Sequence, residues 1–268
     1  MQKNAFSASG LALSQTNPKD WPKELISHEH LIYSSPAALS FNSPGAKGFG
    51  VKRAALTIPD SVMLLFSPAC CGRNTSAIGG AYSKYASRMF YLLLNDTDIV
   101  TGRYLKRIVM ACEEILQTVT KRPSCIVLCS TCIDALLGTD MDRVTRMVEE
   151  TCQIPCLSAT MYALTREGHL PPMVLVRKTV YSLLKPRPKK STTANLLGFF
   201  THLCDSSELY TLLHDIGITK INELGRMTSM DEYHTLSEAN FNLVLYPETR
   251  FAANFFQEKL QIPFVELY

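Results

Sequence analysis

Two apolar runs of similar form stand out along the chain. Residues 61–66 read SVMLLF and residues 124–129 read SCIVLC, and each run leads into a short polar turn. Short apolar runs bounded by turn residues are typical of strands that are buried on both faces of a parallel sheet. The pattern therefore predicts two buried parallel strands, each ending in a polar loop.

The segments that follow these strands have the periodicity of amphipathic helices. Apolar side chains recur on one helical face between about Tyr104 and Thr118, and again between about Asp140 and Glu150. Residues 152–157 are expected to enter a further short strand. Strands that alternate with helices in this way indicate a parallel, doubly wound sheet.

A second α/β unit follows a break in this rhythm. Pro171-Pro172 and the basic, proline-containing stretch 185–190 mark a connection between domains. The elements expected after it are a strand at 195–200, a helix capped by Asp205 or Ser206 that ends at Gly217, strands at 218–221 and 241–245, a helix over 249–260 and a closing strand at 262–267.

The predicted fold class is therefore α/β, with two doubly wound, Rossmann-like parallel-sheet units. The predicted domain organisation is an irregular N-terminal segment (1–55), a first α/β domain that carries the cysteine loops (56–180), a linker (181–193) and a second α/β domain (194–268).

Composition narrows the class of protein further. The chain has 268 residues, of which 46% are hydrophobic and 19% charged, as in ordinary globular proteins. A net charge of +3 gives no reason to expect a nucleic-acid partner. The first thirty residues lack the form of a signal peptide, and no run approaches the roughly 20 apolar residues of a membrane helix. We therefore expect a cytoplasmic protein, whose nine cysteines do not form a disulfide framework.

Cysteines follow both apolar runs directly. Cys70 and Cys71 lie in the loop after the first run, and Cys132 lies in the loop after the second. Because parallel strands deliver their loops to the same edge of a sheet, these thiols are expected to share one site.

Several chemistries are compatible with such a site. An iron–sulfur cluster needs about four thiolates. Zinc would use C-x-x-C pairs such as Cys129/Cys132, but no second pair of this kind matches it. Thiol redox chemistry at the same C-x-x-C lacks its usual sequence surroundings. Cys152 and Cys156 have a C-x-x-x-C spacing that can suit a metal, and all of the cysteines could instead be core residues.

The order of the motifs resembles the nitrogenase component 1 superfamily, which includes nitrogenase subunits, dark-operative protochlorophyllide reductase and the nickel-tetrapyrrole reductive cyclase of methanogens. The family's Gly-Pro-x-x-Cys loop resembles residues 67–71, its Asn-Asp-Ile-Val-x-Gly element resembles 96–102, and its Thr-Cys loop with Gly-Asp-Asp resembles 131–132 with 138–140. Family strands also resemble 195–198 and 262–266. The double cysteine is nearest to the reductive cyclase and protochlorophyllide reductase types, and the resemblance covers roughly residues 44–268.

Departures from the family limit what it implies. The nitrogenase α subunit has a further cysteine upstream, where this chain has none around Gly45. The cysteine that holds the iron–molybdenum cofactor would fall near Tyr246, so this cofactor is not expected. The resemblance leaves the third α/β domain of the large subunits without a counterpart in these 268 residues. The resemblance thus points to a nitrogenase-like protein and not to nitrogen fixation.

The resemblance implies that Cys71 and Cys132 are cluster ligands and that Cys70 can replace or supplement either. Two thiolates per chain would make four in a symmetric pair, which suits one [4Fe–4S] cluster at a subunit interface. The expected protein is an oxygen-sensitive oxidoreductase subunit, in a homodimer or in a heterodimer with a paralogous subunit. It would relay electrons from an ATP-dependent, nitrogenase reductase-like iron protein to an unassigned substrate.

Arg73, Asn74 and Arg250 are the polar residues expected to line the substrate crevice, and no catalytic residue is assigned. The alternative from another class is a non-catalytic scaffold or carrier that holds a metal cluster or a tetrapyrrole during cofactor assembly. A purely structural protein with core cysteines is the third possibility.

Overall fold

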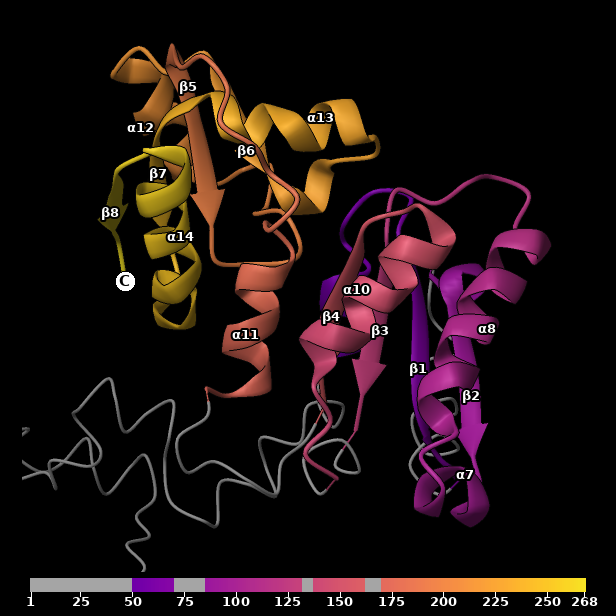
Figure 1. Ribbon diagram of the computed structural model, residues 1–268. Coiled ribbons are helices and arrows are strands. Elements are labelled where there is room, and N and C mark those ends of the chain that lie inside the picture. The colour runs from indigo at the N-terminus through magenta and orange to yellow at the C-terminus, as the bar shows by residue number, and fades with distance from the viewer. Residues whose placement is uncertain (1–49, 70–84, 132–136, 162–169) are drawn as a thin grey trace, which may run out of the picture.

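Two four-stranded parallel sheets form the framework of the computed structural model, which describes residues 50–69, 85–131, 137–161 and 170–268 (Figure 1). The first sheet has the strand order β2-β1-β3-β4, and the second has the order β6-β5-β7-β8. Every strand pairs in parallel with its neighbours. The predicted α/β class with two doubly wound units is confirmed.

The strands are β1 (Val62–Pro68), β2 (Met89–Leu94), β3 (Ile126–Ser130), β4 (Cys156–Thr160), β5 (Lys190–Leu197), β6 (Lys220–Glu223), β7 (Ala239–Val244) and β8 (Phe264–Glu266). The α-helices are α5 (Val51–Ala55), α7 (Asp96–Val100), α8 (Tyr104–Thr118), α10 (Met141–Cys152), α11 (Pro172–Thr179), α12 (Glu208–Asp215), α13 (Met230–His234) and α14 (Arg250–Leu260). Short 3-10 helices lie at η2 (Ala86–Arg88), η3 (Leu224–Arg226), η4 (Thr235–Glu238) and η5 (Pro247–Thr249).

The two central strands of the first sheet, β1 and β3, are buried on both faces, which explains their continuous apolar runs. Successive side chains of a strand point to opposite faces. On β1, Leu64 and Phe66 pack in the core that α8 and α10 cover, whereas Met63 and Leu65 pack in the core that contains α5 and α11.

The two amphipathic helices of the first unit follow the sequence pattern closely. Helix α8 begins and ends at the predicted residues, and its stripe includes the fully buried Ile108 and Cys112. Helix α10 starts after Asp140, whose carboxylate accepts a hydrogen bond of 2.9 Å from the Arg143 amide and so caps the helix.

Some elements differ from the sequence prediction. Strand β5 begins at Lys190, five residues before the predicted start, and the residue that precedes α12 is Ser207 instead of Asp205 or Ser206. Strand β2 and helix α11 were not predicted at all. Strand β2 is largely only half-buried and has no alternating pattern. Helix α11 starts at Pro172, where proline fits the first helical turn because it needs no hydrogen-bond donor there.

Helix α11 connects the two sheets. It packs against α5 and β4 of the first unit and against α14 and η5 of the second. The basic stretch that follows is held on η4: the Lys189 ammonium donates to the Ser237 carbonyl at 2.9 Å, and Arg187 and Lys190 pair with Glu238. The division of the chain at 181–193 stays a prediction.

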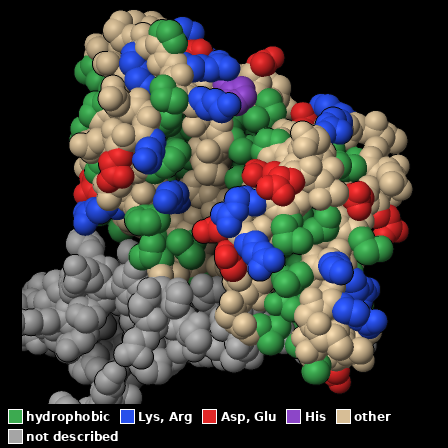
Figure 2. All heavy atoms as spheres, in the orientation of Figure 1, with side chains coloured by type: hydrophobic (Ala, Val, Ile, Leu, Met, Phe, Trp, Pro, Cys, Tyr) green, Lys and Arg blue, Asp and Glu red, His purple; other side chains and the backbone are tan. Residues whose placement is uncertain are grey.

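The molecular surface mixes both signs of charge. On the face shown in Figure 2, basic and acidic side chains are interspersed with scattered hydrophobic ones. Within the ranges that the structure describes, no helix has the length and hydrophobicity that crossing a bilayer requires.

Candidate functional site

The topology of each sheet singles out one pair of strand ends. In the first sheet the chain passes from β1 to β2 on one side and then to β3 on the other, so the connections diverge between β1 and β3. Ligands of open α/β sheets bind at such a switch point, outside the carboxyl ends of the strands. Strands β1 and β3 are hydrogen-bonded neighbours, with Leu65 opposite Cys129. Their loops, which begin at residues 69 and 131, therefore leave the same edge of the sheet.

The predicted cysteine site lies on these two loops. The five predicted residues Cys70, Cys71, Arg73, Asn74 and Cys132 are outside the described residues, so their roles stay predictions. What the structure gives is the pair of strands that carries them.

Buried hydroxyl groups mark the same edge. Ser67 near the end of β1, Thr131 just after β3 and Thr160 at the end of β4 each have a buried side-chain oxygen without a hydrogen-bond partner. Buried polar groups in native proteins are usually paired, and an unpaired one calls for an explanation such as strain, a bound water or an ion. Hydroxyl donors beside two cysteine loops suit an anionic iron–sulfur group, whose sulfurs accept hydrogen bonds.

The cysteines of the strands and helices behave as core residues. Cys112, Cys125, Cys129, Cys152 and Cys156 are all buried free thiols. Burial raises the pKa of Cys129 to about 12, so this thiol stays protonated at neutral pH. Within the described ranges no three His, Cys, Asp or Glu side chains come together to hold a metal ion. These positions argue against thiol redox chemistry at Cys129 and against a separate metal pair at Cys152 and Cys156.

The second sheet has its own switch point, between β5 and β7. Here Arg177 of α11 is almost completely buried and donates hydrogen bonds to the Gly198 carbonyl and, at 3.3 Å, to Glu248 Oε2. Its guanidinium lies 4.8 Å from the ring centroid of Phe200 and 4.9 Å from that of Tyr246. The side chain thus ties α11 to the loops after both strands. The only signal for it in the sequence is weak, an arginine within an apolar stretch.

Close contact between those loops depends on Gly198. Its φ is +150°, and a Cβ atom there would lie 3.1 Å from the Tyr246 nitrogen. The rings of Phe199 and Tyr246 stand 6.0 Å apart, and both are partly exposed to solvent. An aromatic surface beside a buried cation therefore lies at this edge. In Figure 1 the arrows of β3 and β5 both point downward, so the carboxyl ends of the two sheets face the same way.

Arg250 is the one predicted polar residue that the structure describes. It starts α14, and its guanidinium donates to Glu266 of β8 at 2.5 and 2.7 Å and to the Tyr268 hydroxyl at 2.9 Å. The hydrogen bonds to Glu266 raise the pKa of this guanidinium. Arg250 therefore fixes the end of β8, and its role toward a substrate stays a prediction.

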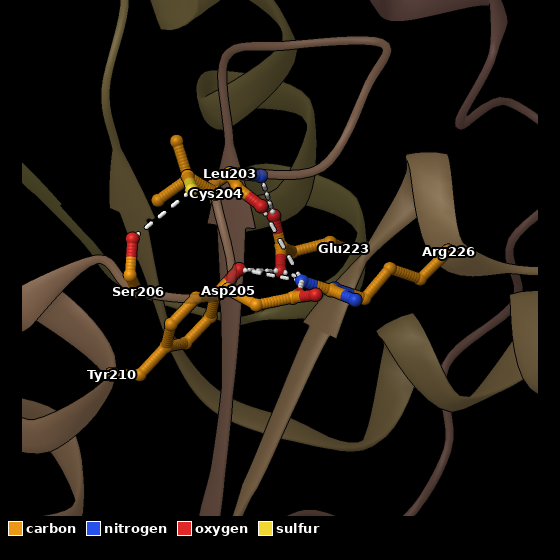
Figure 3. A network of polar contacts seen from close by, with 7 residues as sticks. All are labelled: Leu203, Cys204, Asp205, Ser206, Tyr210, Glu223 and Arg226. Carbon is orange, nitrogen blue, oxygen red and sulfur yellow. Dashed lines mark hydrogen bonds and ion pairs between the residues drawn. The ribbon is translucent and has the colours of Figure 1, made fainter.

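A polar network closes the carboxyl end of β6 (Figure 3). Glu223 accepts hydrogen bonds from the Leu203 amide at 2.8 Å, the Tyr210 hydroxyl at 2.5 Å and Arg226 Nε at 3.0 Å. Arg226 also pairs with Asp205. These groups satisfy one another's hydrogen-bonding capacity, so the network holds the loop after β5 against β6.

Nearby, the exposed Cys204 thiol has a lowered pKa because the Ser206 hydroxyl lies 3.1 Å from its sulfur.

Comparison with known proteins agrees with this topology. Residues 47–268 match the family model described as nitrogenase component 1 type oxidoreductase. The chain is 27% identical over 207 residues to one of the subunits of the light-independent protochlorophyllide reductase of Nephroselmis olivacea, covering 68% of this chain and 39% of that protein. It is 25% identical over 217 residues to the nitrogenase iron-molybdenum cofactor biosynthesis protein NifE of Clostridium pasteurianum, covering 78% and 46%.

The chain thus spans less than half the length of these relatives. Among solved structures, nitrogenase Cp1 at pH 6.5 superposes with a TM-score of 0.60 at 18% identity, over 81% of this chain and 44% of that one. That structural likeness concerns the fold alone. Because the family model matches most of the sequence, the chain belongs to the nitrogenase component 1 type oxidoreductase family.

Proposed function

We propose that this chain is a subunit of a nitrogenase-like oxidoreductase and that Cys71 and Cys132 hold an iron–sulfur cluster, with Cys70 as a replacement or additional ligand. The observation that carries the proposal is the position of the two cysteine loops, which leave neighbouring strands at the switch point of the first sheet. When bound there, the cluster would supply one-electron redox chemistry.

Two chains together would provide the four thiolates of one [4Fe–4S] cluster, so we propose a homodimer or a heterodimer with a paralogous subunit. The electron donor would be an ATP-dependent iron protein of the nitrogenase reductase type. No iron–molybdenum cofactor is expected. The chain's own residues would bind and orient the substrate from the edge of the second sheet, where we place Arg250; Arg73 and Asn74 are proposed from the first.

The decisive experiment measures iron and acid-labile sulfide per chain after strictly anaerobic purification. We expect about two irons per wild-type chain and their loss in both Cys71→Ala and Cys132→Ala. Cys204→Ala is the matched control, because Cys204 is an exposed free thiol in the second unit, and its iron content should equal that of the wild type. Iron that survives both substitutions would contradict the assigned ligands, and iron-free wild type would contradict the cluster.

A second candidate function is a scaffold or carrier for a metal cluster or a tetrapyrrole during cofactor assembly. It is favoured by the similarity to NifE proteins, which are named as cofactor biosynthesis proteins. Electron uptake that depends on a substrate, an iron protein and ATP distinguishes the two. A catalytic subunit consumes electrons over many turnovers, whereas a carrier transfers its cargo once to an acceptor protein.

A further inference from the structure

One face of the second sheet is covered by a helix at one edge and open at the other, where β8 is the outermost strand (Figure 1). Four residues in register form a row across this face: Glu223 of β6, Leu196 of β5, Leu243 of β7 and Val265 of β8. The first three are buried, and Leu213 of α12 packs in one core with Leu196 and Leu243. Val265 is 58% exposed, so the cover that α12 provides ends before β8.

The exposed part of this face continues beyond the end of β8. The Leu267 amide donates to the Val244 carbonyl at 2.8 Å, which extends the pairing with β7 past Glu266. Because side chains two residues apart on a strand share a face, Leu267 follows Val265 on the same side. Leu267 is exposed as well.

Helix α12 turns an apolar flank toward this open edge. Leu213 faces the sheet, and Tyr210, on one side of it, donates to Glu223 of β6 at 2.5 Å. With about 3.6 residues per turn, Leu212 and Ile216 lie on the opposite flank, toward β7 and β8. They are 60% and 70% exposed. The four exposed apolar residues Leu212, Ile216, Val265 and Leu267 are called the open face below.

The width of the sheet leaves space for one more helix at the open face. Neighbouring strands are about 4.8 Å apart, so four strands span about 15 Å, whereas a helix is about 10 Å in diameter. The other side of the same sheet carries two helices: Tyr233 of α13 and Phe256 of α14 are fully buried in one core with Leu197 of β5. A helix beside α12 would complete the second layer of this unit.

The rim of the open face is acidic. Glu208 and Asp215 are exposed on α12, four and three residues from Leu212, and among the described residues neither forms an ion pair. Asp215 is also the last residue of α12, where the helix dipole disfavours a carboxylate. A cationic group from a partner would offset both of these unfavourable features.

We propose that the open face binds an amphipathic α-helix of another polypeptide, which packs beside α12 with its apolar stripe and directs lysine or arginine side chains at Glu208 and Asp215. Burial of the exposed apolar side chains drives the association, and the acidic rim selects a basic flank. A second copy that used the same face would bring its own acidic rim to the contact, which like charges disfavour. The inference concerns the second unit and is independent of the proposed cluster.

The test measures binding of the full chain to a labelled synthetic helix by fluorescence anisotropy. The peptide has leucines at positions i, i+3, i+4 and i+7 and lysines along one flank. It should bind saturably, and more tightly than a matched peptide with glutamates in place of the lysines. Leu212→Gln combined with Val265→Thr should weaken binding about tenfold, because two buried aliphatic contacts are lost. The control Val100→Thr changes an 85% exposed apolar residue of α7 in the first unit and should bind like the wild type.

The charge requirement is tested with Glu208→Gln combined with Asp215→Asn. This variant should bind the lysine and glutamate peptides with similar affinity. Equal affinity of the two peptides for the wild type would overturn the proposed basic flank.

Melting temperatures are measured on all variants and should match the wild type, because the substituted side chains are exposed. No binding to the wild type, or an equal loss in Val100→Thr, would overturn the inference. A wild-type dimer that Leu212→Gln dissociates would assign the open face to a second copy and overturn it too. Should Val265→Thr fail to fold, the comparison of Leu212→Gln with Val100→Thr decides alone. The iron content of the cysteine variants tests the proposed function separately.

Discussion

Asp98 is a buried carboxylate that relies on its neighbours. It lies on α7, directly after β2, and forms a reciprocal capping box with Asn95. It also pairs with Arg103 at 3.3 Å and with Arg107 of α8. Burial acts to raise its pKa, but the hydrogen bonds from the Asn95 amide and Arg107 outweigh this and hold the pKa below its usual value. The ionised form therefore stabilises the fold.

The sign of this pKa shift predicts a pH dependence. Because the native pKa is lowered, the stabilisation is present above the unfolded pKa of about 3.9 and is lost as the pH falls through the native pKa. Asp98→Asn should melt below the wild type at pH 7, and the difference should shrink as the pH approaches about 3. Asp96→Asn, an exposed position on the same helix, is the control for thermal melts across this range. A difference that stays constant with pH would contradict the account.

Arg177 leads to a second expectation for a single side chain. Replacement by methionine keeps much of the aliphatic length but leaves the Gly198 carbonyl and Glu248 without their donor. The cost should be about 2–3 kcal/mol in the free energy of unfolding, measured by denaturant titration. Arg187→Met is the comparison, because Arg187 pairs with Glu238 at 3.6 Å and is 42% exposed; its cost should stay below about 1 kcal/mol. Equal losses of stability in the two variants would show that burial of the Arg177–Glu248 ion pair does not determine the cost.

Within the second sheet, an asparagine ladder joins three strands. Asn195 of β5 stands opposite Asn222 of β6 and Asn242 of β7. Asn195 Nδ2 donates to Asn242 Oδ1 at 2.7 Å and to the Leu236 carbonyl at 2.9 Å, and its Oδ1 accepts from Asn222 at 2.9 Å. These bonds fix η4 on the sheet and offset the cost of burying the amides of Asn195 and Asn222, whereas Asn242 Nδ2 is buried without a hydrogen-bond partner.

Breaking the ladder at its centre should destabilise the whole sheet. Asn195→Ala removes one amide and leaves three buried groups with fewer partners, so we expect a loss of about 2–3 kcal/mol in the free energy of unfolding. Ser191→Ala, an exposed position on the same strand, should change it by less than about 0.5 kcal/mol. Chemical denaturation of both variants checks this, and a similar small effect for each would refute a structural role of the ladder.

The whole molecule is organised by the two switch points and by α11 between the sheets. If two chains share one cluster, dimer assembly and cluster binding are linked. A cluster that binds only to the dimer stabilises the dimer relative to the separate chains. Light scattering under anaerobic conditions should give twice the chain mass for wild type and the single chain mass for Cys132→Ala. Cys204→Ala should remain dimeric. An iron-loaded monomer would contradict the shared cluster, and an iron-free dimer would place the interface elsewhere.

The amino-acid sequence alone determined the elements in which apolar residues recur with the period of a helix or form the continuous run of a buried strand. The stripe of α8, the apolar runs of β1 and β3 and the order of motifs were enough for the fold class, because burial on a defined face imposes a spacing on the chain. The two cysteine loops were singled out in the same way, because each directly follows a buried strand, and the roles of their cysteines stay predictions. The sequence pattern did not predict strand β2 or helix α11. An edge strand such as β2 needs no alternation of polar and apolar residues, and the prolines at the start of α11 were interpreted as a break between domains.

Only the tertiary structure decided which groups meet. The pairing of β1 with β3 and the burial of Arg177 between the loops after β5 and β7 both depend on strand order. A sequence pattern specifies which side of an element is apolar, but it does not specify the element that covers it. Cys129 illustrates the difference: its C-x-x-C spacing suggested chemistry, whereas its position inside the core keeps the thiol protonated.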